Sequence, residues 1–272
     1  MSITTYYAIA LSVSAVVSLA IAFWIWSRRS VPGGMYFSLM MLAVSEWAIA
    51  ATFEAISVET TMKILWSQIS YVGITSAPLF FFLFALNYWR PDIRLRLLYQ
   101  VLIWIIPVVT IIMAATNEIH GLLWNSFTPG PEGTNALVYG HGTWFWIHVV
   151  YSYSLMLASV ALLVRALLSF PYIYRRQSFV VLIAAMLPWV ANVVYVAGFS
   201  PLPGLDPAPM AFSVTGFVLA LGIVKFQLLN IVPVARELLL QRMDSGVMVV
   251  DNQGRIVDVN PAAECLVGRK IK

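Results

Sequence analysis

Long apolar segments constrain this chain more than any other feature. A helix needs about 20 consecutive apolar residues to cross the hydrocarbon core of a bilayer. Seven stretches meet this requirement: residues 5–26, 35–57, 62–89, 97–115, 144–169, 177–198 and 207–229. We therefore predict an all-α membrane protein with a seven-transmembrane helix bundle.

The overall composition agrees with this prediction. Apolar residues make up 61% of the 272 residues, and charged residues only 10%. Soluble domains carry roughly 25% charged residues, so most of this chain is expected to lie in lipid. Membrane lipids are its expected surroundings, and we expect no nucleic-acid partner.

Charged residues alternate between successive connections. Every second connection, namely residues 57–62, 116–143 and 199–206, contains no arginine, whereas the connections between them are rich in arginine. Cytoplasmic connections of membrane proteins are enriched in Lys and Arg, which predicts an outside N-terminus and a cytoplasmic C-terminus. The basic residues of the predicted cytoplasmic side are Arg28, Arg29, Arg90, Arg94, Arg96, Arg165, Arg175, Arg176, Lys225 and Arg236.

The C-terminal residues differ from the apolar region. In "DSGVMVVDNQGRIVDVNPAA" (244–263), two β-type runs, Val247–Val250 and Ile256–Val259, flank a turn sequence. Asn260 stands at the expected N-cap of a helix that begins at Pro261. The stretch predicts the start of a small α/β domain. Residues between it and the last apolar stretch have helical spacing, which is typical of a connecting helix that pairs in a parallel dimer or of a plain linker.

Polar side chains within the apolar stretches gather in their predicted outer halves. Such groups are costly in a membrane and indicate function, although interhelical hydrogen bonds and aromatic packing also account for them. We predict a pocket that opens outward and binds a small amphipathic or lipid-like ligand. Its candidate residues are Glu46, Glu54, Gln68, Tyr71, His148, Tyr151, Trp189 and Asn192.

The long connection 116–143 contains the turn-rich sequence Pro129–Gly133, which predicts either a lid over this pocket or an exposed loop. His120, His141 and His148 with Glu118 match no compact metal-ligand spacing. No nucleophile elbow or phosphate-binding glycine loop occurs. We expect no metal, no cofactor and no catalytic residues in this chain.

Several functional classes fit a bundle of seven apolar helices. A retinal protein is disfavoured, because Lys225 lies near the cytoplasmic end of the last stretch and the third stretch has no acidic residue. A transporter is less favoured, since no internal repeat is visible. A ligand-binding receptor and a bilayer-state sensor or dimerising membrane anchor remain as alternatives.

Five segments resemble one known family: "LWSQISYVGITSAPLFFFLFALNYW" (65–89), "TNEIHGLLW" (116–124), "GTWFWIHVVYSYSL" (142–155), "RRQSFVVLIAAMLPWVANVVYVAG" (175–198) and "PLPGLDPAPMAFSVTGFVLALGIVKFQLLNIVPVARELLLQRMDSGVMVVD" (201–251). Together they resemble the seven-transmembrane N-terminal sensor region of bacterial and archaeal histidine kinases, followed by the start of a PAS domain.

The resemblance implies a sensor domain over 1–229, a connecting signalling helix over 230–244 and a truncated PAS start over 245–272. It further implies the plasma (inner) membrane of a prokaryote, a homodimer and a multi-pass input module of a two-component system. A downstream histidine kinase core, or less commonly a diguanylate cyclase, would provide the output, and the kinase would act on a response regulator. Ligand binding would move the last span and thereby the cytoplasmic domains.

Overall fold

The computed structural model describes residues 3–29, 31–93, 95–169, 172–199, 204–225, 243–250 and 256–267. The chain forms two compact units, Met1–Leu228 and Leu229–Lys272. The first unit is almost entirely helical, with one two-stranded sheet, and the second contains another two-stranded sheet and a short helix.

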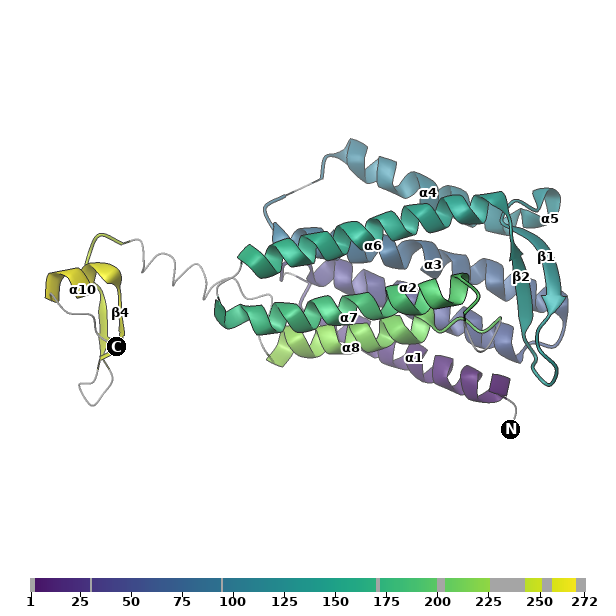
Figure 1. Cartoon of the computed structure of the whole chain (residues 1–272), viewed down its shortest axis with the longest axis horizontal. Helices are drawn as coiled ribbons and strands as arrows, with labels where there is room; N and C mark the ends of the chain where they lie inside the picture. The colour runs from purple at the N-terminus through teal and green to yellow at the C-terminus, as the bar shows by residue number, and fades with distance from the viewer. Residues whose placement is uncertain are drawn as a thin grey trace. The chain divides into compact units, whose positions relative to one another are not determined.

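Each predicted apolar stretch holds one long helix of the first unit (Figure 1). Among the described residues, five helices are long and apolar enough to cross a membrane: α1, α2, α3, α4 and α6. The apolar segments of α7 and α8 are shorter, at Leu182–Val196 and Ala208–Gly222. The bounds are α1 Ile3–Trp26, α2 Gly34–Ile56, α3 Thr60–Trp89, α4 Leu97–Ala115, α6 Thr143–Ser169, α7 Tyr172–Val196 and α8 Ala208–Lys225.

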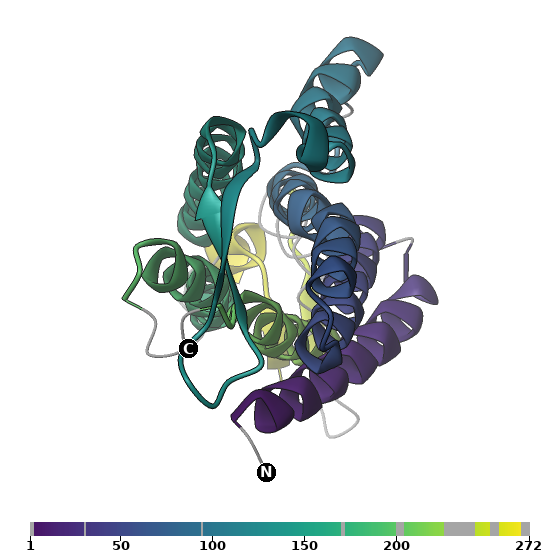
Figure 2. The ribbon, with the colours of Figure 1, turned by 90° about the vertical axis from the view of Figure 1, so that its right-hand side faces the viewer.

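Six of these helices form a closed ring. In the order α1, α2, α3, α6, α7 and α8, each packs on the next, and α8 returns to α1 (Figure 2). Helix α4 lies outside the ring against α3 and α6, and its buried residues are only Pro107, Thr110 and Ala114. The remaining surface of α4 is apolar and exposed, as expected of a helix that faces hydrocarbon.

Small polar residues hold α1 against its neighbours. Ser38 of α2 donates to the carbonyl oxygen of Ala22 at 2.7 Å, and the Ser18 and Ser213 hydroxyls join α1 to α8 at 2.7 Å. In a membrane, lipid is as apolar as a leucine side chain, so helices associate through close packing and such hydrogen bonds. The serine and alanine content of α1 therefore places its backbone close to α2 and α8.

Helices α2 and α3 meet most closely at Gly73. A Cβ atom at this position would lie 2.3 Å from the carbonyl oxygen of Ala43 and 2.7 Å from the Cβ atom of Trp47. Neither distance is compatible with a side chain, so the present helix separation requires glycine here.

The connection 116–143 is a structured hairpin, and the alternative of a plain exposed loop does not describe it. The short helix α5 (Asn117–His120) precedes strands β1 (Trp124–Pro129) and β2 (Leu137–His141), which pair antiparallel with an irregularity next to Trp124. The Asn117 side chain orders the entry to β1: its Oδ1 atom accepts from the Leu123 and Trp124 amides at 3.0 and 2.9 Å. The turn-rich sequence Pro129–Gly133 between the strands is typical of a loop, and no strands are therefore predicted here from the sequence.

The C-terminal ends of α1, α3 and α6 lie at the end of the ring opposite this hairpin (Figure 1), and Arg28, Arg90 and Arg165 lie in or next to these helix ends. The guanidinium groups of Arg90 and Arg165 each lie 5.7 Å from the ring centroid of Trp89, and Arg28 lies 5.6 Å from that of Trp24. Amphipathic Trp and charged Arg are both typical of a membrane–water interface. The positive-inside rule predicts that this end faces the cytoplasm.

The second unit contains strands β3 (Met248–Val250) and β4 (Ile256–Val259), which pair antiparallel, and helix α10 (Pro261–Val267). The Asn260 Oδ1 atom accepts from the Ala263 amide at 3.0 Å and from the Val247 amide at 2.7 Å. The predicted N-cap is thus confirmed, and the same side chain joins the helix to the hairpin. Of the predicted connecting helix 230–244, residues 230–242 lie outside the described residues.

We expect Gly73→Ala to lower the thermal stability of the detergent-purified protein. The added methyl group forces α2 and α3 apart, and overpacking of this kind costs about 1–3 kcal/mol. Val72→Ala is the matched control, because Val72 is the neighbouring residue on α3 and is 44% exposed. Equal melting temperatures for the two variants would contradict close packing at Gly73.

Candidate ligand-binding site

A cavity of about 150 Å³ lies inside the ring at the hairpin end. Five ring helices (α2, α3, α6, α7 and α8) contribute to its wall, together with Tyr7 of α1, strand β2 and the segment before α8. An engineered protein cavity of similar volume accommodates a benzene ring. The space therefore suits a small molecule with a body the size of one ring.

Helical periodicity determines which residues of α2 and α3 reach the cavity. On α2 the lining residues are Trp47, Ala51, Glu54 and Ala55, a spacing of four, three and one that keeps one face. On α3 they include Ser67, Ser70, Tyr71, Ile74 and Pro78, which again share one face. Each helix thus presents a narrow stripe to the cavity and packs elsewhere with its neighbours.

Glu54 and Lys63 hold the hairpin over the cavity. The Tyr139 hydroxyl of β2 donates to Glu54 Oε1 at 2.6 Å. The Lys63 ammonium group donates to the carbonyl oxygens of Glu54 at 3.0 Å and of Asn135 at 2.6 Å. Lys63 is 5% exposed, so its charge is buried and satisfied mainly by backbone dipoles.

Asn135 adds further attachments from the hairpin turn. Its side-chain amide donates to the carbonyl oxygens of Ala55 at 3.0 Å and Ser57 at 2.7 Å, at the end of α2. Its backbone amide donates to the Thr4 hydroxyl at 3.1 Å, on α1. The turn is thereby joined to two helices, and β2 is kept against the cavity.

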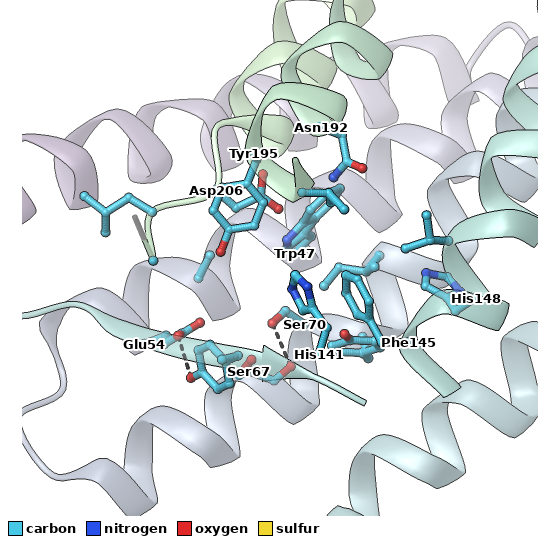
Figure 3. A pocket seen from close by; sticks show the side chains of 18 of the residues that line it. Trp47, Glu54, Ser67, Ser70, His141, Phe145, His148, Asn192, Tyr195 and Asp206 are labelled. Carbon is cyan, nitrogen blue, oxygen red and sulfur yellow. Dashed lines mark hydrogen bonds between the residues drawn. The ribbon is translucent and has the colours of Figure 1, made fainter. Parts of the chain in front are cut away.

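Asp206 supplies a second carboxyl group to the same side of the cavity as Glu54 (Figure 3). Its Oδ1 atom accepts from the Ala208 amide at 2.9 Å, and its carbonyl oxygen accepts from the Tyr7 hydroxyl at 2.9 Å. Burial raises the pKa of Asp206 to about 6, although the Ala208 hydrogen bond acts in the opposite direction. Asp206 therefore titrates within the physiological range.

The hairpin groups nearby keep their neutral forms at pH 7. Burial, together with the neighbouring Glu54 charge, raises the pKa of the Tyr139 hydroxyl, which remains a hydrogen-bond donor. Burial lowers the pKa of His141, whose ring stacks on Phe145 with centroids 3.7 Å apart. Neither group adds a charge to the cavity.

His148 of α6 lies away from Glu54 and Asp206 in the cavity wall, whereas Asn192 of α7 lies nearer to Tyr195 and Asp206 (Figure 3). His148 is 5% exposed; its Nε2 atom lies 3.4 Å from the Ser152 hydroxyl, and its Nδ1 atom has no partner among the described residues. The Trp189 Nε1 atom is buried without a described partner as well. Asn192 accepts from the Tyr153 hydroxyl at 2.9 Å.

Unpartnered buried donors are rare, because each costs about 1–3 kcal/mol in lost solvation. At this wall two nitrogens, one on His148 and one on Trp189, lack a described partner. A ligand with a hydrogen-bond acceptor would satisfy them. Among the described residues, no group of three His, Cys, Asp or Glu side chains is arranged to hold a metal ion.

The structure brings together five of the eight candidate residues in the cavity wall: Glu54, Tyr71, His148, Trp189 and Asn192. Glu46, Gln68 and Tyr151 do not line it. The Tyr151 hydroxyl instead donates to the carbonyl oxygen of Ile103 on α4. Glu46 packs against Gly73, and its carboxyl oxygens have no hydrogen bond of normal geometry with a described residue.

A rotation about each helix explains these differences. Eight residues at about 100° each exceed two full turns by about 80°, so Glu46 and Glu54 lie on different faces of α2. Gln68 follows the lining residue Ser67 by one position and is thus rotated by about 100° on α3.

Sequence reasoning missed several lining residues. Tyr139 and Asn135 belong to the segment predicted as a lid or an exposed loop, where no predicted strand places their side chains. Tyr7 lies near the start of α1 beside other polar residues, and nothing in the sequence distinguishes it from them. Lys63 is not among the candidates although it lies four residues, about one helical turn, before Ser67 on α3, and this spacing was a usable signal.

We expect Tyr139→Phe to destabilise the protein by about 1–3 kcal/mol, because Glu54 Oε1 then loses its donor within the buried site. Thermal melts of the purified protein in detergent would measure the loss. Tyr99→Phe removes a hydroxyl from a side chain that is 53% exposed and should leave the melting temperature unchanged. Equal effects of the two substitutions would argue against the hydrogen bond.

Asp206 predicts a pH dependence of stability. Its pKa is about 6 in the folded protein and 3.8 in its ordinary environment, so between these values the folded state binds more protons. The free energy of unfolding should therefore fall as pH rises from about 4 to 6, by up to about 3 kcal/mol. Asp206→Asn keeps the acceptor for the Ala208 amide and removes this dependence. Melting curves recorded from pH 4.5 to 7.5 should diverge for the two proteins; parallel curves would contradict the assignment.

Comparison with protein families gives a match to the N-terminal 7TM region of histidine kinase over residues 10–233. No curated protein sequence matches the chain. The matched residues include α2, α3, α4, the hairpin, α6, α7 and α8, and thus nearly every element that lines the cavity. The chain belongs to the family of N-terminal 7TM regions of histidine kinases.

Proposed function

We propose that this chain is the ligand-binding input module of a two-component histidine kinase. The observation that carries the proposal is the cavity of about 150 Å³ whose lining residues include two carboxyl groups and two residues, His148 and Trp189, with buried nitrogens that lack described partners. A wall of this kind, largely aromatic with a few convergent polar groups, is typical of small-molecule sites. The ligand is small and amphipathic.

The proposed topology has seven spans, with an outside N-terminus and a cytoplasmic C-terminus. The hairpin end, with its cavity, then faces outward, and the arginine end faces the cytoplasm. The C-terminal unit, with two strands followed by a helix, is proposed to be the start of a cytoplasmic PAS domain. The kinase acts as a homodimer in a prokaryotic plasma membrane and transfers phosphate to a response regulator.

Signal transfer is proposed to occur through α8. Phe212 of α8 lines the cavity and stacks near Trp47 of α2, with ring centroids 6.1 Å apart. Asp206 caps the beginning of the same helix. A ligand that favours one position of α8 over another by 1.4 kcal/mol would change the equilibrium between the two arrangements about tenfold.

A thermal-shift screen of the detergent-purified protein against soluble compounds and lipids tests the ligand-binding role. A specific compound at 100 times its dissociation constant should stabilise the protein by about 2.7 kcal/mol. His148→Ala should abolish this shift, because it removes a group from the cavity wall. Gln68→Ala is the control and should preserve it, since Gln68 lies outside the cavity.

The other classes give different results in the same system. A bilayer-state sensor or a dimerising anchor would respond to lipid composition, and no soluble compound would produce a shift that depends on His148. A transporter would move the bound compound across the membrane of reconstituted vesicles. Either result would contradict the receptor proposal.

A further inference from the structure

The two sides of the cavity differ in charge. Glu54 and Asp206 lie on one side, close enough to interact electrostatically, and both keep accessible surface although protein surrounds them. Because they line the cavity, this surface is available to a molecule inside it. His148 of α6 lies away from both carboxyl groups (Figure 3), and the cavity wall also contains the uncharged side chains of Trp189 and Asn192.

The charges on the acidic side are not balanced. Among the described residues that line the cavity, Lys63 provides the positive charge. Its ammonium group already donates hydrogen bonds to the carbonyl oxygens of Glu54 and Asn135. No ion pair with Glu54 or Asp206 occurs among the described residues. Two carboxyl groups and one ammonium group leave one excess negative charge, which a buried site must neutralise with a proton or a bound cation.

Aromatic side chains surround the carboxyl groups. Tyr195 lies beside Asp206, and Trp47 lies between the acidic side and His148 in Figure 3. The Trp47 indole is 5% exposed and packs near Phe212. Aromatic faces attract organic cations, and the attraction is strongest for Trp and in sites shielded from water.

A buried group on the far side independently indicates a ligand. His148 lines the cavity, is 5% exposed and has an Nδ1 atom without a described partner. The Trp189 Nε1–H donor is also without one. A hydrogen-bonding group at the end of the ligand away from its charge would provide the partner that these nitrogens lack.

We propose that the cavity binds a small organic amine, with the ammonium group at Glu54 and Asp206, a ring-sized apolar body among the aromatic side chains, and a hydrogen-bonding group at His148 and Trp189. This inference rests on the proposed ligand-binding role and specifies the chemical class of the ligand. The ammonium group takes the place of the proton that otherwise neutralises the acidic side.

Three probes with one phenol body and different second groups test the charge requirement. They are tyramine with an ammonium group, tyrosol with a hydroxyl group and 4-hydroxyphenylacetate with a carboxylate. Binding to the full chain in detergent is measured by titration calorimetry at pH 7.5. Tyramine should bind at least about tenfold more tightly than the other two, because only it neutralises the excess charge.

Two isosteric variants locate the ammonium group. Asp206→Asn and Glu54→Gln should each weaken tyramine binding by at least about thirtyfold, since they remove a desolvated charge partner. Both should change tyrosol binding by less than about threefold. Asp206→Asn keeps a side-chain oxygen that can accept from the Ala208 amide, and Glu54→Gln keeps one that can accept from the Tyr139 hydroxyl, so both substitutions preserve the existing hydrogen bonds. Because two variants are used, a folding defect in one of them does not invalidate the test. Gln68→Ala serves as the control that leaves all three affinities unchanged.

The amine assignment is overturned if tyramine does not bind, if tyrosol or 4-hydroxyphenylacetate binds as tightly, or if neither variant affects tyramine. If compounds of another class bind in a manner that depends on His148, the receptor role stands while the amine assignment falls. If no soluble compound of any class binds to the cavity, the receptor role itself falls.

Discussion

The buried ammonium group of Lys63 is the contact on which the cavity depends. It joins the end of α2 to the hairpin turn through two carbonyl oxygens, one from each element. Without these two hydrogen bonds, the hairpin would still be attached through the Asn135 and Tyr139 side chains. The ammonium group of Lys63 would then be a buried charge without hydrogen-bond partners. A buried charge is tolerated only with good hydrogen bonds, so the lysine, the hairpin and the end of α2 must adopt their positions together.

The closed ring produces the cavity as a consequence of close packing elsewhere. Gly73 allows α2 and α3 to approach closely, and serine hydrogen bonds join α1 to α2 and α8. At the hairpin end the ring includes large aromatic side chains, such as Trp47, Tyr71 and Trp189, which line the cavity. The hairpin covers the space that remains. The cavity is thus lined by helices and a strand, which suits the proposed role in which ligand binding favours one helix position over another.

Much of the architecture was predictable from the sequence, and so was part of the site. The stretch predicted at residues 97–115 has the same limits as α4, and the Asn260 cap of α10 was identified correctly. Glu54, Tyr71 and His148 were recognised because polar groups are costly in a membrane wherever they point. Glu46 was chosen by the same argument, yet it packs against Gly73. The energetic cost of a polar group in a membrane indicates that the group has a role. It does not indicate whether that group lines a cavity or packs against a neighbouring helix.

The sequence alone determined where the helices run, because each helix satisfies its own backbone hydrogen bonds and needs only a sufficient apolar length in lipid. The alternation of arginines determined which ends of the helices belong together, since consecutive helices reverse direction. The tertiary structure decided which face of each helix meets the cavity, because about 100° of rotation per residue makes neighbouring positions point differently. It also decided that Tyr139 and Asn135 belong to the site, because their places depend on Glu54, Lys63 and the end of α2, which are distant in the chain.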